Sequence, residues 1–190
     1  MNKSEKNYWS QFYKNKNIPS EPSNFCKFIY DHEIFDENKM NILDCGCGNG
    51  RDSYYFSKKF NVTGLDTSSK PVNKENCKFI QCDFCSYNKD KFDIIYSRFT
   101  FHSISNQQQI DFLKSITKGS YLCIETRSDK TSSIKKVHGD DHYRNYTNYN
   151  KLINLLYVMD FNIIYSEEKR GFAIYKDEDP CCIRIICQKI

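Results

Sequence analysis

The segment that most constrains the fold is a short apolar run that leads directly into alternating glycines. Ile42 and Leu43 read as a buried strand that ends at Asp44, and the GxGxG turn 46–50 follows. Glycines permit positive φ angles and let the backbone approach a ligand with no Cβ in the way. A helix that begins near Arg51 would offer its unpaired N–H groups and its positive dipole end to a carboxylate or phosphate. The segment therefore predicts a strand, a ligand-binding turn and a helix of an α/β protein.

Two further acids close later apolar segments. Asp66 closes the segment 61–66, about 20 residues after the turn, where a carboxylate suits the two hydroxyls of a ribose. A helix N-cap before Thr67 is the alternative role. Asp83 and Phe84 close the next apolar segment, so that an acid and an aromatic ring stand together. A purely structural glycine turn in another α/β protein is the alternative reading, and it leaves both later features unexplained.

In this order and spacing, these three features resemble the landmarks of the class I S-adenosylmethionine-dependent methyltransferases. The resemblance is to small stand-alone members, such as the tellurite-resistance methyltransferases. It implies an α/β fold with a Rossmann-like, seven-stranded, mostly parallel sheet, an antiparallel last strand and helices on both faces. It implies S-adenosylmethionine as the cofactor and S-adenosylhomocysteine as the product. The cofactor-binding residues that it implies are Asp44, Gly46, Gly48, Arg51, Asp52, Asp66, Thr67, Asp83, Phe84 and Ser97.

The resemblance also implies which part of the cofactor each of these residues contacts. The methionine part lies against the glycine turn, with Asp44 near its ammonium group and with Arg51 and Asp52 beside it. Asp66 holds the ribose. Asp83 and Phe84 hold the adenine. The carboxylate of Asp83 accepts a hydrogen bond from the exocyclic amine, and the ring of Phe84 packs on the base.

The rest of the chain alternates between strand-like and helix-like segments. Because only residues 169–180 separate the last two expected strands, a helical crossover does not fit there, and these strands should pair antiparallel. Strands are expected at 41–44, 61–66, 78–82, 91–97, 120–125, 162–167 and 182–187, and helices at 4–16, from 24, after 50, at 107–116 and at 150–159.

A length of 190 residues predicts a single domain, 1–190, in which residues 1–35 form an amino-terminal helical cap. Four aromatic residues of the first helix fall on one helical face. That face either packs on the body of the protein or forms a lid over the cofactor. The four residues are Tyr8, Trp9, Phe12 and Tyr13.

The segment after the fourth strand is where the resemblance places the loop that reaches the transferable methyl group. It lacks the Asp/Asn-Pro-Pro-aromatic signature of enzymes that methylate the amino groups of adenine or glutamine, and its titratable group is His102. A histidine can take a proton from a hydroxyl near neutral pH, so we predict His102 as the catalytic base. The alternative is that it orders the loop or caps the next helix.

A long polar excursion, 126–148, follows the fifth strand. A connection of this length in a compact domain is either a functional lid or a disordered loop. Its histidines, tyrosines, arginines and aspartates favour an acceptor lid. The predicted acceptor-binding residues are Arg98, His142, Tyr143 and Arg144.

Composition limits the partners, the location and the metal content that we expect of this protein. The net charge of +4 is mild and the lysines are scattered, so a nucleic-acid partner is not required. The absence of a signal-like start and of an apolar run near the ~20 residues of a membrane span leads us to expect a cytoplasmic protein. The ten cysteines then read as reduced, largely buried thiols. Cys82 and Cys85 have a CxxC spacing but no second pair, so no metal is expected.

Together these features predict an S-adenosylmethionine-dependent methyltransferase that acts on a small polar molecule, through O-methylation of a sugar or nucleotide sugar. An RNA or protein methyltransferase is the first alternative, because lysines and arginines occur in the excursion 126–148. A non-catalytic subunit that binds S-adenosylmethionine is the second. The acceptor atom and the oligomeric state are left open.

Overall fold

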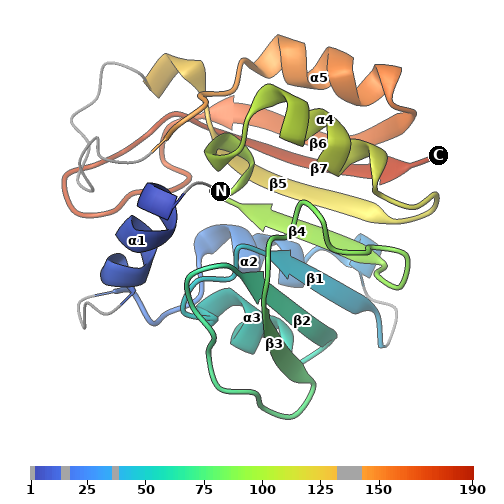
Figure 1. Ribbon diagram of the computed structural model, residues 1–190. Coiled ribbons are helices and arrows are strands. Elements are labelled where there is room, and N and C mark those ends of the chain that lie inside the picture. The colour runs from blue at the N-terminus through green and yellow to red at the C-terminus, as the bar shows by residue number, and fades with distance from the viewer. Residues whose placement is uncertain (1–2, 14–17, 36–38, 132–142) are drawn as a thin grey trace. The chain divides into compact units, whose positions relative to one another are not determined.

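The computed structural model describes residues 3–13, 18–35, 39–131 and 143–190 (Figure 1). Its contacts divide the chain into two compact units, residues 1–96 and 97–190, and each is described by itself. Strand β4 (Ile94–Arg98) passes the boundary. The expectation of a single domain stays a prediction.

The first unit is built from parallel strands and short helices. β1 pairs in parallel with both β2 and β4, and β2 pairs in parallel with β3. Asp44 therefore stands opposite Gly64 on one side and Tyr96 on the other. The elements before β4 are α1 (Lys3–Phe12), α2 (Asn24–Tyr30), the short helical turn η1 (Glu33–Phe35), β1 (Asn41–Cys45), α3 (Arg51–Phe56), β2 (Asn61–Asp66) and β3 (Cys77–Gln81).

Aromatic packing holds the helices of this unit to its strands. The ring of Phe25, from α2, stacks on Tyr96 at 5.2 Å between centroids, and Phe56, from α3, meets the same ring edge-on at 4.9 Å. All three side chains are almost fully buried. Ser23 caps the amino end of α2 by accepting a hydrogen bond from the amide of Cys26. The predicted face of α1 is also made of rings in contact, with Trp9 and Phe12 5.4 Å apart.

The second unit contains the antiparallel part of the sheet. β7 pairs antiparallel with both β5 and β6, which confirms the pairing predicted for the last two strands. Figure 1 shows α5 lying along β6, against which it packs. The elements are η2 (Phe101–Ser103), α4 (Asn106–Lys114), β5 (Tyr121–Arg127), η3 (Asp129–Thr131), α5 (Tyr149–Val158), β6 (Phe161–Lys169) and β7 (Cys182–Lys189).

The strand order is β3-β2-β1-β4-β5-β7-β6 in one seven-stranded sheet. The predicted fold class, a mostly parallel Rossmann-like sheet with an antiparallel last strand, is confirmed. Several bounds differ from the expectation by a few residues. β5 runs on to Arg127, and β6 starts at Phe161 and runs on to Lys169, because pairing with the long strand β7 continues through these residues.

Candidate functional site

The glycine turn adopts the conformation that its sequence predicts. Gly46, Gly48 and Gly50 have φ angles of 80°, 57° and 79°, a region that favours glycine. The amides of Gly46 and Cys47 both donate to the carbonyl of Leu65, at 2.7 and 2.9 Å. The turn is therefore fastened to the end of β2.

A tyrosine from the amino-terminal segment lies directly over this turn. An ideal Cβ built on Gly48 would come within 2.6 Å of the Tyr13 hydroxyl oxygen. Burial raises the pKa of Tyr13, and the nearby Asp66, Cys47 and Asp44 raise it further, so its hydroxyl stays protonated. The helical periodicity of the aromatic residues indicated a face. It gave no signal that the last ring of that face would reach the glycines.

The two acids at the strand ends are held by hydrogen bonds within the first unit. Asp44 is 3% exposed, and its carboxylate accepts from the hydroxyl of Ser53 at 2.5 Å, which ties β1 to α3. Asp66 accepts from three backbone amides, those of Gly48 at 3.0 Å, Ser68 at 2.7 Å and Ser69 at 3.1 Å. Burial raises the pKa of Asp66, while these hydrogen bonds oppose the rise.

The residues that flank the turn make contacts to the segment before α2. Asp52 is buried, and its carboxylate accepts from the Ser23 amide and hydroxyl, both at 2.7 Å, and from the Tyr96 hydroxyl at 2.8 Å. Arg51 donates to the carbonyl of Glu21 at 3.2 Å. These contacts anchor the start of α2 on α3. A direct role of Arg51, Asp52 or the neighbouring Thr67 in cofactor binding stays a prediction.

A buried lysine supports the loop that carries the predicted adenine-binding pair. Asp83 accepts from the amide of Cys85 at 2.9 Å, which closes the turn. The Nζ atom of Lys89, 1% exposed, donates to the carbonyls of Phe84 and Tyr87, both at 3.0 Å. Burial lowers the pKa of Lys89. Sequence reasoning missed this residue, because a lone lysine in a polar loop reads as a solvated side chain.

In the second unit, the end of β4 and the residues that follow it have a strained backbone and buried polar groups. Ser97 is fully buried and its hydroxyl lies 2.7 Å from that of Thr100. Arg98 donates through Nε to Glu125 at 2.9 Å. Phe99 has a φ of 58°, which is unusual for a bulky residue, and its amide donates to the carbonyl of Glu125. A strained backbone held in place by its surroundings is a frequent property of functional sites.

His102 is buried in the same unit, with 4% of its surface exposed. Its Nδ1 accepts from the amide of Arg127 at 3.3 Å and lies 3.2 Å from the hydroxyl of Thr126. Because an amide can only donate, the proton of the neutral ring belongs on Nε2. A base needs a lone pair, and the one on Nδ1 already receives the Arg127 N–H. This geometry favours the alternative role, in which His102 orders the loop, and the role of catalytic base stays a prediction.

The comparisons with known proteins agree with this geometry. A family model described as a methyltransferase domain matches residues 21–165. The chain belongs to the class I S-adenosylmethionine-dependent methyltransferases. It is 32% identical over 155 residues to malonyl-[acyl-carrier protein] O-methyltransferase 2 of Ilyobacter polytropus, a match that covers 70% of this chain and 59% of that protein. The chain thus spans less than two thirds of the length of the curated relatives it matches.

Two solved methyltransferase structures show the same fold. The 1,6-didemethyltoxoflavin-N1-methyltransferase of Burkholderia thailandensis, with 1,6-didemethyltoxoflavin and S-adenosylhomocysteine bound, has a TM-score of 0.67 at 16% identity, over 87% of this chain and 76% of that chain. TehB from Haemophilus influenzae has a TM-score of 0.65 at 16% identity, over 98% of this chain and 67% of that chain. The family model and the Ilyobacter relative confirm the family resemblance, and with it S-adenosylmethionine as the cofactor.

The first unit of this methyltransferase fits that cofactor by the chemistry of its groups. Three glycines at positive φ bring bare backbone to one place, and carboxylates stand at the ends of β1 and β2. Asp44 would meet the methionine ammonium and Asp66 the ribose hydroxyls. The pair at 83–84 would meet the adenine. Each of these assignments remains a prediction for its residue.

The predicted acceptor lid is only partly described. His142 lies outside the described residues. Tyr143 is 47% exposed, and Arg144 is half-buried. The neighbouring Asn145 ties the excursion to η2, because its amide donates to the carbonyl of His102 at 2.7 Å. Their roles in acceptor binding stay predictions.

All ten cysteines are free thiols. Eight of the ten are buried, and Cys82 and Cys85 are half-buried, which confirms the expectation of largely buried thiols. Burial raises the pKa of Cys85 to about 12, so this thiol stays protonated at neutral pH. Among the described residues no group of three or more potential metal ligands comes together. No described helix is long and apolar enough to cross a membrane.

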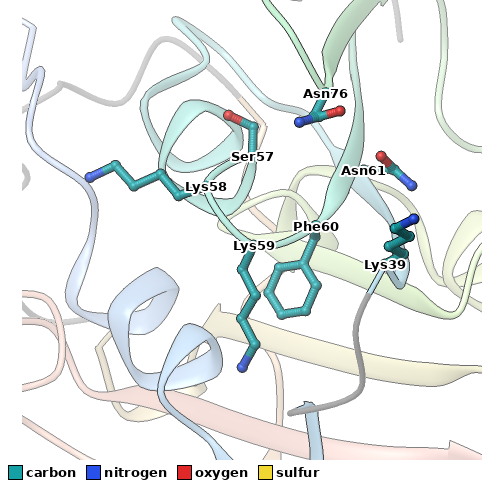
Figure 2. A pocket seen from close by; sticks show the side chains of 7 residues that line it. All are labelled: Lys39, Ser57, Lys58, Lys59, Phe60, Asn61 and Asn76. Atoms are coloured by element: carbon teal, nitrogen blue, oxygen red, sulfur yellow. The ribbon is translucent and has the colours of Figure 1, made fainter.

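A pocket of about 400 Å³ opens elsewhere in the first unit, where α3 has ended and β2 begins (Figure 2). Figure 2 shows its lysine side chains pointing in different directions, and none of the predicted cofactor residues lines it. Lys58 and Lys59 lie over the rings of Tyr55 and Tyr30, at 4.5 and 5.7 Å. The lining residues are Lys39, Ser57, Lys58, Lys59, Phe60, Asn61 and Asn76.

Proposed function

We propose that this chain transfers the methyl group of S-adenosylmethionine to an oxygen atom of a small polar acceptor. The observation that carries the proposal is the pair of charged groups at the end of β4 and on β5. Arg98 and Glu125 are held there beside the strained Phe99. Glu125 holds the Arg98 guanidinium in place, and the Arg98 side chain keeps 19% of its surface exposed, so a polar acceptor is the kind of molecule that this position suits.

The name of the Ilyobacter relative supports oxygen as the acceptor atom, since that protein is an O-methyltransferase. A malonyl group carries a carboxylate, so a carboxylic acid is one acceptor class within this proposal. A sugar or nucleotide sugar is another. A metabolite of either kind would contact Arg98, together with His142, Tyr143 and Arg144 from the excursion.

The residues of this chain act mainly by positioning. When bound, S-adenosylmethionine supplies an electrophilic methyl group, whose bond to sulfur breaks toward sulfur as an acceptor lone pair bonds to carbon, leaving S-adenosylhomocysteine. The glycine turn and Asp66 orient the cofactor, and Tyr13 excludes water from above Gly48. The charged groups at the end of β4 and on β5 orient the acceptor. Correct orientation can supply much of the rate increase, because a displacement needs its reacting atoms in line.

A transfer assay tests the proposal. The purified protein is given methyl-labelled S-adenosylmethionine and a host extract that has been separated into small-molecule, nucleic-acid and protein pools. We expect label in the small-molecule pool. An Asp66→Ala variant, which lacks the predicted ribose contact, controls for label transferred by contaminating enzymes. Label in a macromolecular pool would refute a small acceptor and favour an RNA or protein substrate. Bound cofactor with no label in any pool would favour a non-catalytic subunit.

A further inference from the structure

Asn145, near the end of the excursion 126–148, is fastened to the segment around η2. Its backbone amide donates to the carbonyl of His102 at 2.7 Å. Its side-chain Nδ2 donates to the carbonyl of Ile104 at 3.2 Å and to Oδ1 of Asn106 at 2.7 Å. A side-chain amide nitrogen carries two N–H donors, so one asparagine can hold both oxygens. These two side-chain bonds span 41 and 39 positions of the chain.

The next residues of the excursion are fastened to the end of β5 instead. The amide of Thr147 donates to the carbonyl of Arg127 at 3.0 Å, and its own carbonyl accepts from the amide of Asp129 at 2.9 Å. The hydroxyls of Thr147 and Thr126 lie 3.2 Å apart, and both side chains are buried. Asn148 caps α5 and donates to Asp129 at 2.7 Å. These bonds anchor the returning chain to β5 independently of η2.

The bonds of Asn145 have a different effect, because they join two segments that were assigned to the acceptor on separate grounds. The segment after β4 contains His102, and it is where the family resemblance places the loop that reaches the transferable methyl group. Tyr143 and Arg144 are predicted acceptor-binding residues, and they directly precede Asn145 in the chain. Tyr143 keeps 47% of its surface exposed, so part of this residue can meet a ligand. The two segments therefore come together at Asn145.

We propose that Asn145 is a positioning residue of the acceptor site, which holds Tyr143 and Arg144 beside the segment after β4 so that one acceptor contacts both. This inference rests on the proposed function and deepens it. Without the Asn145 side chain, the backbone bond to His102 and the anchor on β5 remain, but Tyr143 and Arg144 lose the fastening next to them. The acceptor then has to order these two residues when it binds, and that ordering costs binding free energy.

This mechanism predicts a change in acceptor binding and not in cofactor binding. The two oxygens that the Asn145 side chain holds belong to Ile104 and Asn106, and neither residue is predicted to bind S-adenosylmethionine. Each hydrogen bond contributes modestly, so the loss of both should raise the apparent KM for the acceptor about tenfold. The kcat at saturating acceptor should change less, because the bound acceptor restores the order.

The transfer assay with the small-molecule pool supplies the measurement. Wild type and Asn145→Ala are given saturating methyl-labelled S-adenosylmethionine and a dilution series of that pool, which yields an apparent KM in units of pool concentration. Calorimetry with S-adenosylhomocysteine measures cofactor-site affinity. We expect the KM of Asn145→Ala to be about tenfold higher, with an unchanged affinity for S-adenosylhomocysteine. Asn154→Ala, which changes an exposed asparagine of α5, should leave both values at wild type.

Variants of Asn106 separate positioning from a general loss of structure. Asn106→Asp keeps an oxygen for Nδ2 of Asn145 and places a negative charge in the first turn of α4, where a helix favours it, so this variant should behave as wild type. Asn106→Ala removes that oxygen and should raise the KM by less than Asn145→Ala does. In the double variant, Asn106→Ala should add little to Asn145→Ala, because the bond is already lost. Asn106→Ala also carries the test if Asn145→Ala fails to fold.

The outcomes separate this inference from the proposed function. The inference is overturned, and the proposed function stands, if wild type labels the small-molecule pool and Asn145→Ala keeps the wild-type KM. The same holds if the affinity for S-adenosylhomocysteine falls by the factor by which the KM rises, or if the effects of Asn145→Ala and Asn106→Ala simply add. No label from wild type in any pool refutes the proposed function, and this inference with it. Label in a macromolecular pool refutes a small acceptor, and the same KM comparison with that pool decides the role of Asn145.

Discussion

Replacing Gly48 with alanine tests how the cofactor site is built. At a φ of 57°, an L-residue costs about 1–2 kcal/mol, and the lower entropy of the unfolded chain offsets about 0.4–1 kcal/mol of this. We therefore expect Gly48→Ala to lower the free energy of unfolding by about 1 kcal/mol. The new methyl group would also come within 2.6 Å of the Tyr13 hydroxyl oxygen, closer than real Cβ contacts come, so the tyrosine must move.

We expect Gly48→Ala to weaken cofactor binding by more than it lowers the free energy of unfolding. The added methyl group would displace the Tyr13 ring that packs on Gly48 and so disturb the turn that we predict to meet the methionine part of the cofactor. We expect S-adenosylhomocysteine to bind at least about tenfold more weakly, which corresponds to about 1.4 kcal/mol. Isothermal titration calorimetry measures the affinity, and urea unfolding measures the stability.

Gly171→Ala is the matched control. Gly171 has a φ of 84°, and a Cβ built on it would meet nothing within 4 Å. It should therefore lose a similar amount of stability and keep its affinity for S-adenosylhomocysteine. If Gly48→Ala binds this ligand as tightly as the control does, the glycine turn is not the cofactor cradle and the reasoning fails.

Three further variants test single residues. Because burial raises the pKa of Asp66 above 3.8, its stabilising contribution is present below that pH and is lost as the pH rises through the folded-state pKa. The unfolding free energy of wild type minus that of Asp66→Asn should therefore fall from pH 3.8 upward and then level off. Urea unfolding at a series of pH values measures this difference, and a difference that rises with pH would contradict the prediction. Lys89→Met should weaken S-adenosylhomocysteine binding several-fold, by releasing the loop at 83–84, whereas the exposed control Lys58→Met should not. His102→Ala should lower the unfolding free energy by about 1–3 kcal/mol, because the Arg127 amide loses its acceptor. A fall in turnover of about 100-fold or more, with loss of the acidic limb of the pH–rate profile, would instead establish His102 as the base.

Much of the fold could be read from local sequence signals. The apolar run before the glycine turn, the acid at Asp66 and the short connection at 169–180 each depend on residues close together in the chain. These signals predicted the strand–turn–helix unit, the cofactor and the antiparallel last strand. They succeed because strand formation, positive φ and hairpin pairing are decided within a few residues.

The contacts that complete the two candidate sites were not predictable in this way. Tyr13 reaches Gly48 across 35 positions of the chain, and Glu125 and Arg184 are 59 positions apart. No periodicity or motif links such pairs, because they meet only after the strands have paired. The same is true of Lys89, whose burial turns an ordinary loop lysine into the support of its loop.

The sequence by itself therefore determined the class of protein, the cofactor and the turn that receives it, since these follow from short segments with one low-energy conformation. Only the tertiary structure decided which polar side chains are buried together. It placed His102 with its Nδ1 on a backbone amide and paired two arginines, Arg98 and Arg184, with Glu125. The physical reason is that the cost of burying a charge depends on its neighbours in space, and pairing of distant strands brings those neighbours together.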